Sequence, residues 1–130
     1  MKLSLQLNPD NRPATWEQIE HWRDIHERAP IETSLGWFHG DTLSVSERMA
    51  GSIESFESLP TLNTDGTLTW KQPGQVTVDL TKPQLIQAYN EVKTNRAIRS
   101  SQLHVQAQYF YQSDPIPTVN QLKSINFWLT

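Results

Sequence analysis

The chain has 130 residues, a length that fits one compact domain, and 36% of them are hydrophobic. Five Trp, four Phe and three Tyr argue against a chain that is disordered throughout, because each such side chain buries ~150–250 Å². There are no cysteines, which excludes a disulfide framework, a thiolate metal site and a cysteine nucleophile. The net charge is −3, and residues 81–130 hold only 5 Lys and Arg, too sparse a basic set to indicate nucleic-acid binding.

No stretch approaches the ~20 apolar residues of a membrane span. Near the N-terminus Leu3, Leu5 and Leu7 alternate with polar residues, a pattern that predicts a short strand rather than a signal peptide. We therefore expect the protein to be made in a cytoplasm and to stay there or be packed into a particle.

Two helices are predicted in the first half of the chain. Thr15 to Gln18 forms a capping box, apolar side chains then recur at helical spacing up to His26, and Pro30 ends the helix. Leu35 to Asp41 is predicted to be a strand or a tight turn. A second capping box, Ser44 to Glu47, opens a helix whose apolar stripe is Val45, Met49, Ile53 and Phe56.

A β-hairpin and a long helix follow. Residues 67–70 and 76–80 alternate polar and apolar side chains around Gln72-Pro73-Gly74-Gln75, a type II turn signal. We expect Trp70 to anchor this hairpin in the core. The helix is predicted from Lys82 to Tyr111. Arg96 and Arg99 interrupt its first apolar stripe, which consists of Leu85, Tyr89, Val92, Leu103 and Phe110. Its second stripe is Ile98, Gln102, Val105 and Tyr109. One stripe would pack on the domain and the other on a partner, or both would belong to the core.

The last segment follows a stiff break at Asp114-Pro115-Ile116-Pro117. Thr118 and Gln121 form a third capping box before a short helix, which is too short to be stable alone. It must fold back on the core or dock onto another chain. Our hypothesis is docking, through the partner-binding residues Val119, Leu122, Ile125, Phe127, Trp128 and Leu129.

These elements predict an α+β fold, in which an antiparallel hairpin or small sheet packs on three helices, one of them long, and a short C-terminal helix follows. Residues 1–112 would form a single domain. Residues 113–130 would be a proline hinge and a docking helix.

No constellation of residues indicates catalysis. His21 and His26 are not spaced as metal ligands on one helix face, and the glycines are too scattered for a phosphate loop. His39 with Asp41 is the one candidate acid–base pair, and a turn that carries a packed aromatic explains it better. We expect no catalytic residue, no cofactor and no metal.

The order of these elements resembles an uncharacterised domain of tailed-bacteriophage tail-fibre and tail-assembly proteins, over about residues 16–112. The sharpest part is Ser44 with Glu47-Arg48, followed by Leu68-Thr69-Trp70, then Val76 to Thr81 and the long helix. The resemblance implies no catalytic residues.

The expected function is therefore that of a structural virion protein of the tail, tail fibre or baseplate, which mediates attachment or assembly. Its partners would be other tail proteins and further copies of itself, with a trimer expected if it follows a fibre. The alternatives are a fibre-assembly chaperone, a small regulatory or anti-host binding protein and, with less support, a small enzyme using His39 and Asp41.

Overall fold

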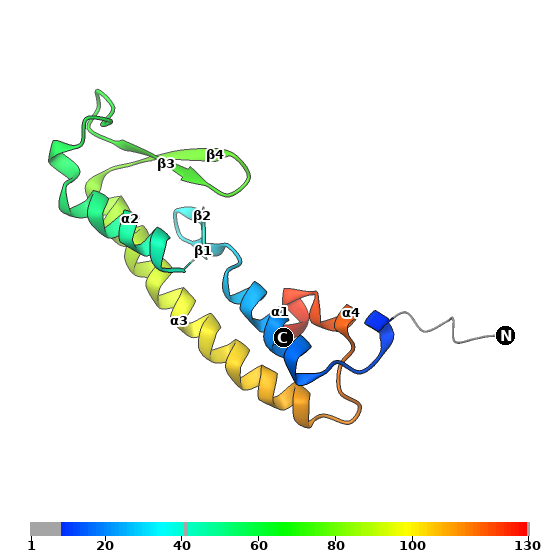
Figure 1. Ribbon diagram of the computed structural model, residues 1–130. Helices are drawn as coiled ribbons and strands as arrows, with labels where there is room; N and C mark the ends of the chain where they lie inside the picture. The colour runs from blue at the N-terminus through cyan, green and yellow to red at the C-terminus, as the bar shows by residue number, and fades with distance from the viewer. Residues whose placement is uncertain (1–8, 41, 130) are drawn as a thin grey trace. The chain divides into compact units, whose positions relative to one another are not determined.

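The computed structural model describes residues 9–40 and 42–129, which form two compact units. The terminal unit combines Met1–Glu27 with Arg99–Thr130, and the central unit is Arg28–Ile98. Helices and two antiparallel two-stranded sheets make up the described chain, which confirms the α+β class (Figure 1). The predicted strand at residues 3–7 lies outside the described residues.

The division of the chain differs from the predicted one. Instead of a domain over residues 1–112 followed by a separate segment, the boundaries fall after Glu27 and after Ile98. The C-terminal residues thus share a unit with the first helix of the chain. This division was not predicted, because the second boundary lies inside a regular helix.

That helix is α3, Lys82–Gln112, close to the predicted bounds. It begins with a capping box, in which the Gln84 amide nitrogen donates to the Thr81 hydroxyl at 3.3 Å and the Thr81 amide to the Gln84 side-chain oxygen at 2.9 Å. The first predicted stripe is buried or half-buried: Leu85, Tyr89, Val92, Leu103 and Phe110. Leu85 and Val92 belong to the core of the central unit, whereas Leu103 and Phe110 belong to that of the terminal unit.

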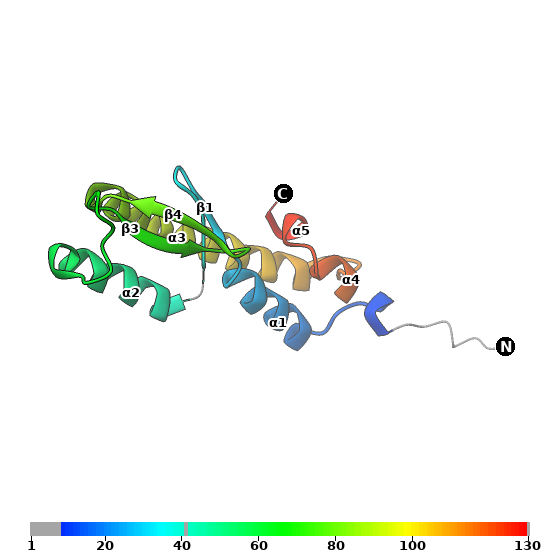
Figure 2. The same ribbon diagram turned by 90° about the horizontal axis from the view of Figure 1, so that it is seen from above.

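The central unit contains β1 (Ile31–Thr33), β2 (Gly36–Phe38), α2 (Thr42–Glu54), a 3-10 turn (Phe56–Ser58), β3 (Leu68–Gln72), β4 (Val76–Leu80) and the first part of α3. Figure 2 shows the β3–β4 hairpin and α2 next to this part of α3. Val45 and Met49 of the predicted α2 stripe are buried and Ile53 packs against the same core, which confirms that part of the stripe. Phe56 is also buried in this core, but it lies in the 3-10 turn, because α2 ends at Glu54. The predicted cap is wrong: α2 begins at Thr42, so Ser44 lies inside the helix.

The predicted hairpin is present. Leu68 pairs with Leu80, Trp70 with Val78 and Gln72 with Val76. Gly74 has a φ of 81° and Gln75 a φ of 61°, so two residues of the connection lie in the left-handed region and only the first is the glycine that favours it. Trp70 is half-buried and packs against the core of the central unit, as expected of an anchor of the hairpin.

A second hairpin, β1–β2, was predicted only as a strand or turn near Leu35. Thr33 pairs with Gly36, whose φ is 106°, around a two-residue loop. Polar contacts fix this loop on α3. The Ser34 amide and hydroxyl donate to the two carboxylate oxygens of Glu91 at 2.9 and 2.6 Å, and these donors lower the pKa of Glu91.

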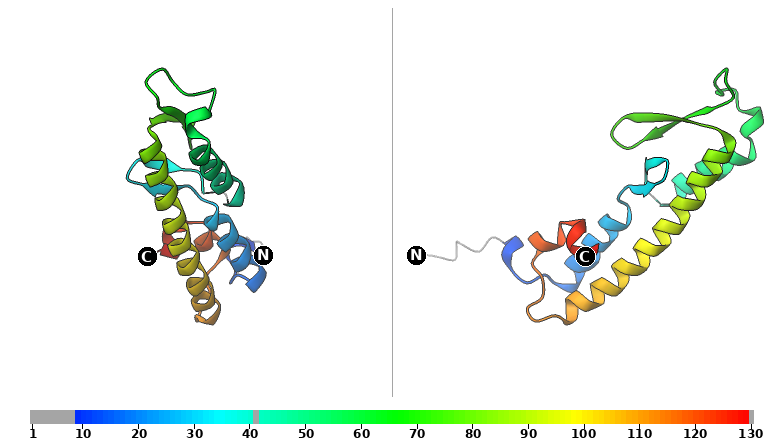
Figure 3. Two further views of the ribbon diagram at one scale, coloured as in Figure 1. Left: turned by 90° about the vertical axis from the view of Figure 1, so that its left-hand side faces the viewer. Right: turned by 180° about the vertical axis from the view of Figure 1, so that it is seen from behind.

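The terminal unit contains a 3-10 turn (Pro9–Asn11), α1 (Trp16–Glu27), the last part of α3, α4 (Val119–Leu122) and α5 (Ile125–Leu129). Figure 3 shows α4 and α5 beside α1. The predicted capping boxes at Thr15 and Thr118 are confirmed. The chain before α1 is joined to the chain before α4, because the Ala14 amide donates to the Pro117 carbonyl at 2.9 Å.

Gly40 and Gly51 of the central unit have very different surroundings, and together they give a matched test of how the chain packs there. A Cβ on Gly40 would overlap the Ala29 carbonyl oxygen, whereas a Cβ on Gly51 in α2 would meet nothing within 4 Å. Gly40→Ala should therefore destabilise the protein by ~1–3 kcal/mol or more, as overpacking does. Gly51→Ala should stabilise it by ~0.5–1 kcal/mol, because alanine favours a helix interior.

Urea denaturation of both variants measures this difference. If the Gly40→Ala protein is as stable as the parent, the chain that follows β2 does not pack tightly against the Ala29 backbone.

Candidate functional site

The predicted partner-binding residues of the C-terminal segment are mostly occupied within their own unit. Val119, Leu122 and Trp128 are buried in one cluster with Ile19 of α1 and Leu103 of α3. Phe127 and Ile125 are half-buried, and the Phe127 ring stacks on Phe110 with centroids 4.9 Å apart. Only Leu129, 39% exposed, faces solvent. This corrects the docking hypothesis for the buried members, since they already pack on the chain itself.

One carbonyl group holds this segment in place. The Leu122 carbonyl oxygen accepts the indole N–H of Trp128 at 2.8 Å and lies 2.7 Å from Nε2 of His26. Since a carbonyl only accepts, Nε2 carries a proton and neutral His26 is the Nε2–H tautomer. Burial lowers the pKa of His26, the Leu122 hydrogen bond opposes that effect, and the charge of Arg99 adds to it.

The second predicted stripe of α3 is a surface. Val105 and Tyr109 are 67% and 64% exposed, and Gln102 is exposed between them and Ile98, itself 53% exposed in the central unit. A hollow of about 280 Å³ in the terminal unit adjoins Gln102, Val105 and Leu129. We call Gln102, Val105, Tyr109 and Leu129 the α3 face.

The charge of this region is unusual for an exposed helix. From Ser100 to Ser113 the sequence contains no Lys, Arg, Asp or Glu. Interfaces between proteins are depleted of charge at their centres and enriched in tyrosine. The α3 face therefore has the composition of a contact surface, whereas the C-terminal segment to which this role was assigned mostly does not reach the surface.

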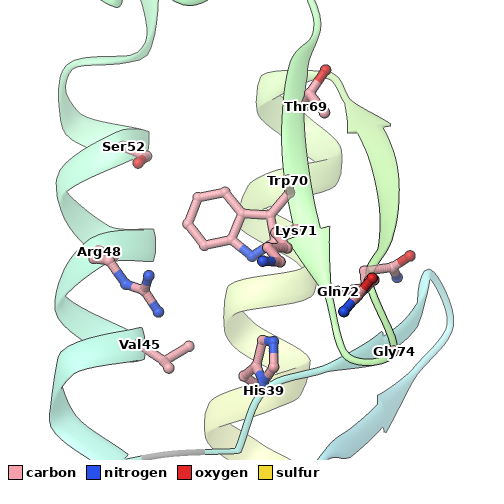
Figure 4. A pocket seen from close by; sticks show the side chains of 10 residues that line it. His39, Val45, Arg48, Ser52, Thr69, Trp70, Lys71, Gln72 and Gly74 are labelled. Atoms are coloured by element: carbon pink, nitrogen blue, oxygen red, sulfur yellow. The ribbon is translucent and has the colours of Figure 1, made fainter.

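A cleft lies in the central unit between α2 and the β3–β4 hairpin, with a volume of about 630 Å³. Its described lining comes from three parts of the chain: His39, then Val45, Arg48 and Ser52 of α2, then Thr69 to Gln72 with Gly74 and Gln75. Figure 4 shows the Trp70 ring pointing toward α2, with the Arg48 guanidinium and the His39 ring directed into the space beside it. We call this the α2–hairpin cleft.

The cleft is cationic. Arg48 and Lys71 line it, and no Asp or Glu is among the described residues that do. His39, the candidate catalytic residue of the enzyme hypothesis, also lines the cleft, but Asp41 lies outside the described residues, so that pair stays a prediction. In the sequence Arg48 and Trp70 are parts of the resemblance to the phage domain, and no local pattern indicates that they face the same space.

In the described part of the chain, no three His, Asp or Glu side chains converge in a way that could hold a metal ion. No helix within that part is long and apolar enough to cross a membrane.

Residues 10–113 match a protein family described as a domain of unknown function, DUF4376. No curated protein and no solved structure matches the chain.

Acid should weaken the terminal unit through His26. Because the pKa of His26 is lower in the folded state, the unfolded chain binds this proton first as the pH falls below about 6.5. The free energy of unfolding should thus be maximal above that pH and should decrease as the pH falls through the folded-state pKa. His26→Gln, which keeps a donor for Leu122, should show a flatter dependence between pH 5 and 7, and His21→Gln serves as the control.

The measurement is thermal unfolding over this pH range, followed by tryptophan fluorescence. If the parent and the His26→Gln protein lose stability in parallel, the buried neutral imidazole is not the acid-sensitive group.

Two neighbouring residues of α5 separate core packing from docking. Trp128→Ala should cost ~3–5 kcal/mol, because it removes a fully buried aromatic side chain. Leu129→Ala should change the stability by less than about 0.5 kcal/mol, as exposed positions do. Denaturation curves decide the matter: a Trp128→Ala protein with unchanged stability would restore the hypothesis that this segment serves a partner.

Proposed function

The chain belongs to the DUF4376 family, and we propose that it is a structural phage protein of the tail, tail fibre or baseplate, which attaches proteins to one another through the α3 face. The phage context rests on the resemblance over residues 16–112, which falls inside the stretch that matches the family, residues 10–113. The description of that family names no function, so the role is argued from the surface.

The observation that carries the proposal is the exposed and uncharged α3 face. Val105 and Tyr109 lie four residues apart on one side of α3, while Leu103, Ala107 and Phe110 bury the other side. The helix is therefore already held by its own core, and its exposed apolar side chains are not needed for that. A rigid helix that presents valine and tyrosine is suited to packing against another helix.

We propose a second copy of this chain as the occupant of the α3 face. Two copies of a charged face repel each other, whereas the run from Ser100 to Ser113 has no formal charge to oppose self-association. Gln102, Val105 and Tyr109 follow the spacing of three and four that lets two helices interlock. In an antiparallel pair related by a two-fold axis, Val105 would meet Val105, and Tyr109 would meet Gln102 of the second copy, where its hydroxyl can donate to the amide oxygen.

The runner-up is a chaperone that leaves after the tail or fibre has assembled. It would use the same face, so the surface does not separate the two roles. Mass spectrometry of purified virions does: a structural part is present in stoichiometric amount, and a chaperone is absent.

Charge on the α3 face should abolish self-association. Val105→Glu would place two carboxylates against each other at the two-fold axis and should raise the dissociation constant at least ~10-fold, which corresponds to ~1.4 kcal/mol. Its stability should change by less than about 0.5 kcal/mol, because Val105 is exposed. Gln18→Glu is the control, since it adds the same charge to the same unit and keeps a capping box.

Sedimentation of the purified proteins gives the result. An equal mixture of Val105→Glu and Val105→Lys chains should associate again, because the pair then carries opposite charges. A parent chain that stays monomeric at all accessible concentrations, or a Val105→Glu chain that associates like the parent, would contradict the proposal.

A further inference from the structure

We infer that the α2–hairpin cleft binds a small anion that carries a planar ring, with Arg48 holding the anionic group and Trp70 contacting the ring. This site lies in the central unit, apart from the surface on which the proposed function rests, and it does not depend on that function.

The two cations that line the cleft differ from other cations of the central unit, because they have no partner among the described residues. Three of the six Lys and Arg side chains in the central unit have partners: Lys82 pairs with Glu57 at 3.0 Å, Lys93 lies over the Tyr89 ring, and Arg96 donates to the Ser46 hydroxyl at 3.0 Å. Arg48 and Lys71 make no ion pair or hydrogen bond within the described residues. An unpaired guanidinium at a cleft is suited to a carboxylate or a phosphate, to which it can donate two parallel hydrogen bonds.

Trp70 is more exposed than its place in the hairpin would lead one to expect. It stands opposite Val78 on the core side of the hairpin, where complete burial would be expected, yet it is half-buried and lines the cleft. Part of the indole is thus exposed to the cleft, and in Figure 4 its six-membered ring points toward α2, where the Arg48 guanidinium lies. Planar rings stack on tryptophan, and a guanidinium nearby favours the same geometry.

The volume of the cleft and its other polar side chains also suit a small ligand. A volume of about 630 Å³ lies within the ~300–1,000 Å³ of small-molecule sites. The half-buried His39 ring and the Ser52 hydroxyl also line the space, and neither makes a hydrogen bond to a described residue through its side chain. Gln72 already has a partner within the protein, because its side-chain amide donates to the Leu35 carbonyl at 3.3 Å. This hydrogen bond holds one side of the cleft in place.

A small ligand is favoured over a nucleic acid. The cleft contributes only two formal cations, and the whole chain carries a net charge of −3. A polyanion needs a longer basic track. A single anionic group beside one ring matches the number of groups that the cleft offers.

The test uses the full chain and four probes. Adenosine monophosphate and benzoate carry both a ring and an anionic group, while adenosine and inorganic phosphate each carry one of the two. Calorimetry gives the affinities, and the indole N–H resonance of Trp70, assigned with Trp70→Phe, reports contact at the site. We expect saturable binding of adenosine monophosphate or benzoate with a shift of the Trp70 resonance, and at least ~10-fold weaker binding of adenosine and of phosphate.

Matched variants locate the anionic group. Arg48→Gln should weaken binding of the ring-bearing anion at least ~10-fold, and Arg28→Gln, at an exposed arginine of the same unit outside the cleft, should leave it unchanged. Arg48 is exposed, so its replacement should not unfold the protein. The Arg48→Gln variant therefore tests the site even if the protein unfolds when Trp70 is changed.

Three results would overturn the inference. One is the absence of saturable binding of either ring-bearing anion at millimolar concentration, and another is equal affinity of the parent and Arg48→Gln. The third is affinity that rises with the length of a single-stranded oligonucleotide, which would indicate a nucleic-acid surface instead.

Discussion

Both hydrophobic cores of this protein are built on one helix. The first part of α3 contributes Leu85, Ala88 and Val92 to the core of the central unit, and its last part contributes Leu103, Ala107 and Phe110 to that of the terminal unit. Between these sets, on the same side of the helix, lie Arg96 and Arg99. Arg96 donates to the Ser46 hydroxyl in the central unit, and Arg99 donates to the His26 carbonyl at 3.3 Å in the terminal unit. Along α3, two half-buried cations with hydrogen-bond acceptors thus lie between the residues that serve the one core and those that serve the other.

This arrangement explains why the apolar stripe of α3 looked weak in the sequence. The stripe is broken where one core ends and the next begins, and at that point the helix needs polar side chains that reach an acceptor rather than more apolar ones. A long helix with an interrupted stripe therefore indicates two packing environments, and the interruption falls at the boundary between them.

Local signals predicted much of the fold. Side-chain caps placed the starts of α1 and α4, because a cap involves residues only three apart. Alternation and the Pro73-Gly74 turn placed the β3–β4 hairpin. The cap proposed at Ser44 was wrong because the helix begins earlier, at Thr42, a position with no comparable signal.

Contacts between distant parts of the chain could not be predicted. The β1–β2 loop depends on Ser34 and Glu91, which are 57 residues apart. The C-terminal segment is held by His26, which is 96 residues from Leu122, and this contact turned a predicted docking helix into part of a core. The α2–hairpin cleft likewise requires Arg48 and Trp70 to face each other across two elements. In contrast, the second stripe of α3 was visible as spacing alone, and its exposure is what the structure added.

The fold thus leaves two surfaces that it does not need for its own packing. The α3 face lies in the terminal unit and is neutral and apolar, whereas the cleft of the central unit is cationic and contains an indole. The first is suited to a second copy of the chain and the second to a small anion, so attachment and ligand binding would occupy different units and could be changed separately.

Disulfide trapping tests the central claim most directly, because the chain has no cysteine of its own. A disulfide requires two Cα atoms ~4.4–6.8 Å apart. In the proposed antiparallel pair, Val105 of one copy faces Val105 of the other, and small adjustments bring their Cα atoms into this range. A Val105→Cys protein should form a covalent dimer on mild oxidation, while a Gln18→Cys protein should not. Equal and slow cross-linking of the two variants would contradict the account, since it would mean that the exposed side of α3 meets a second copy only by random collision.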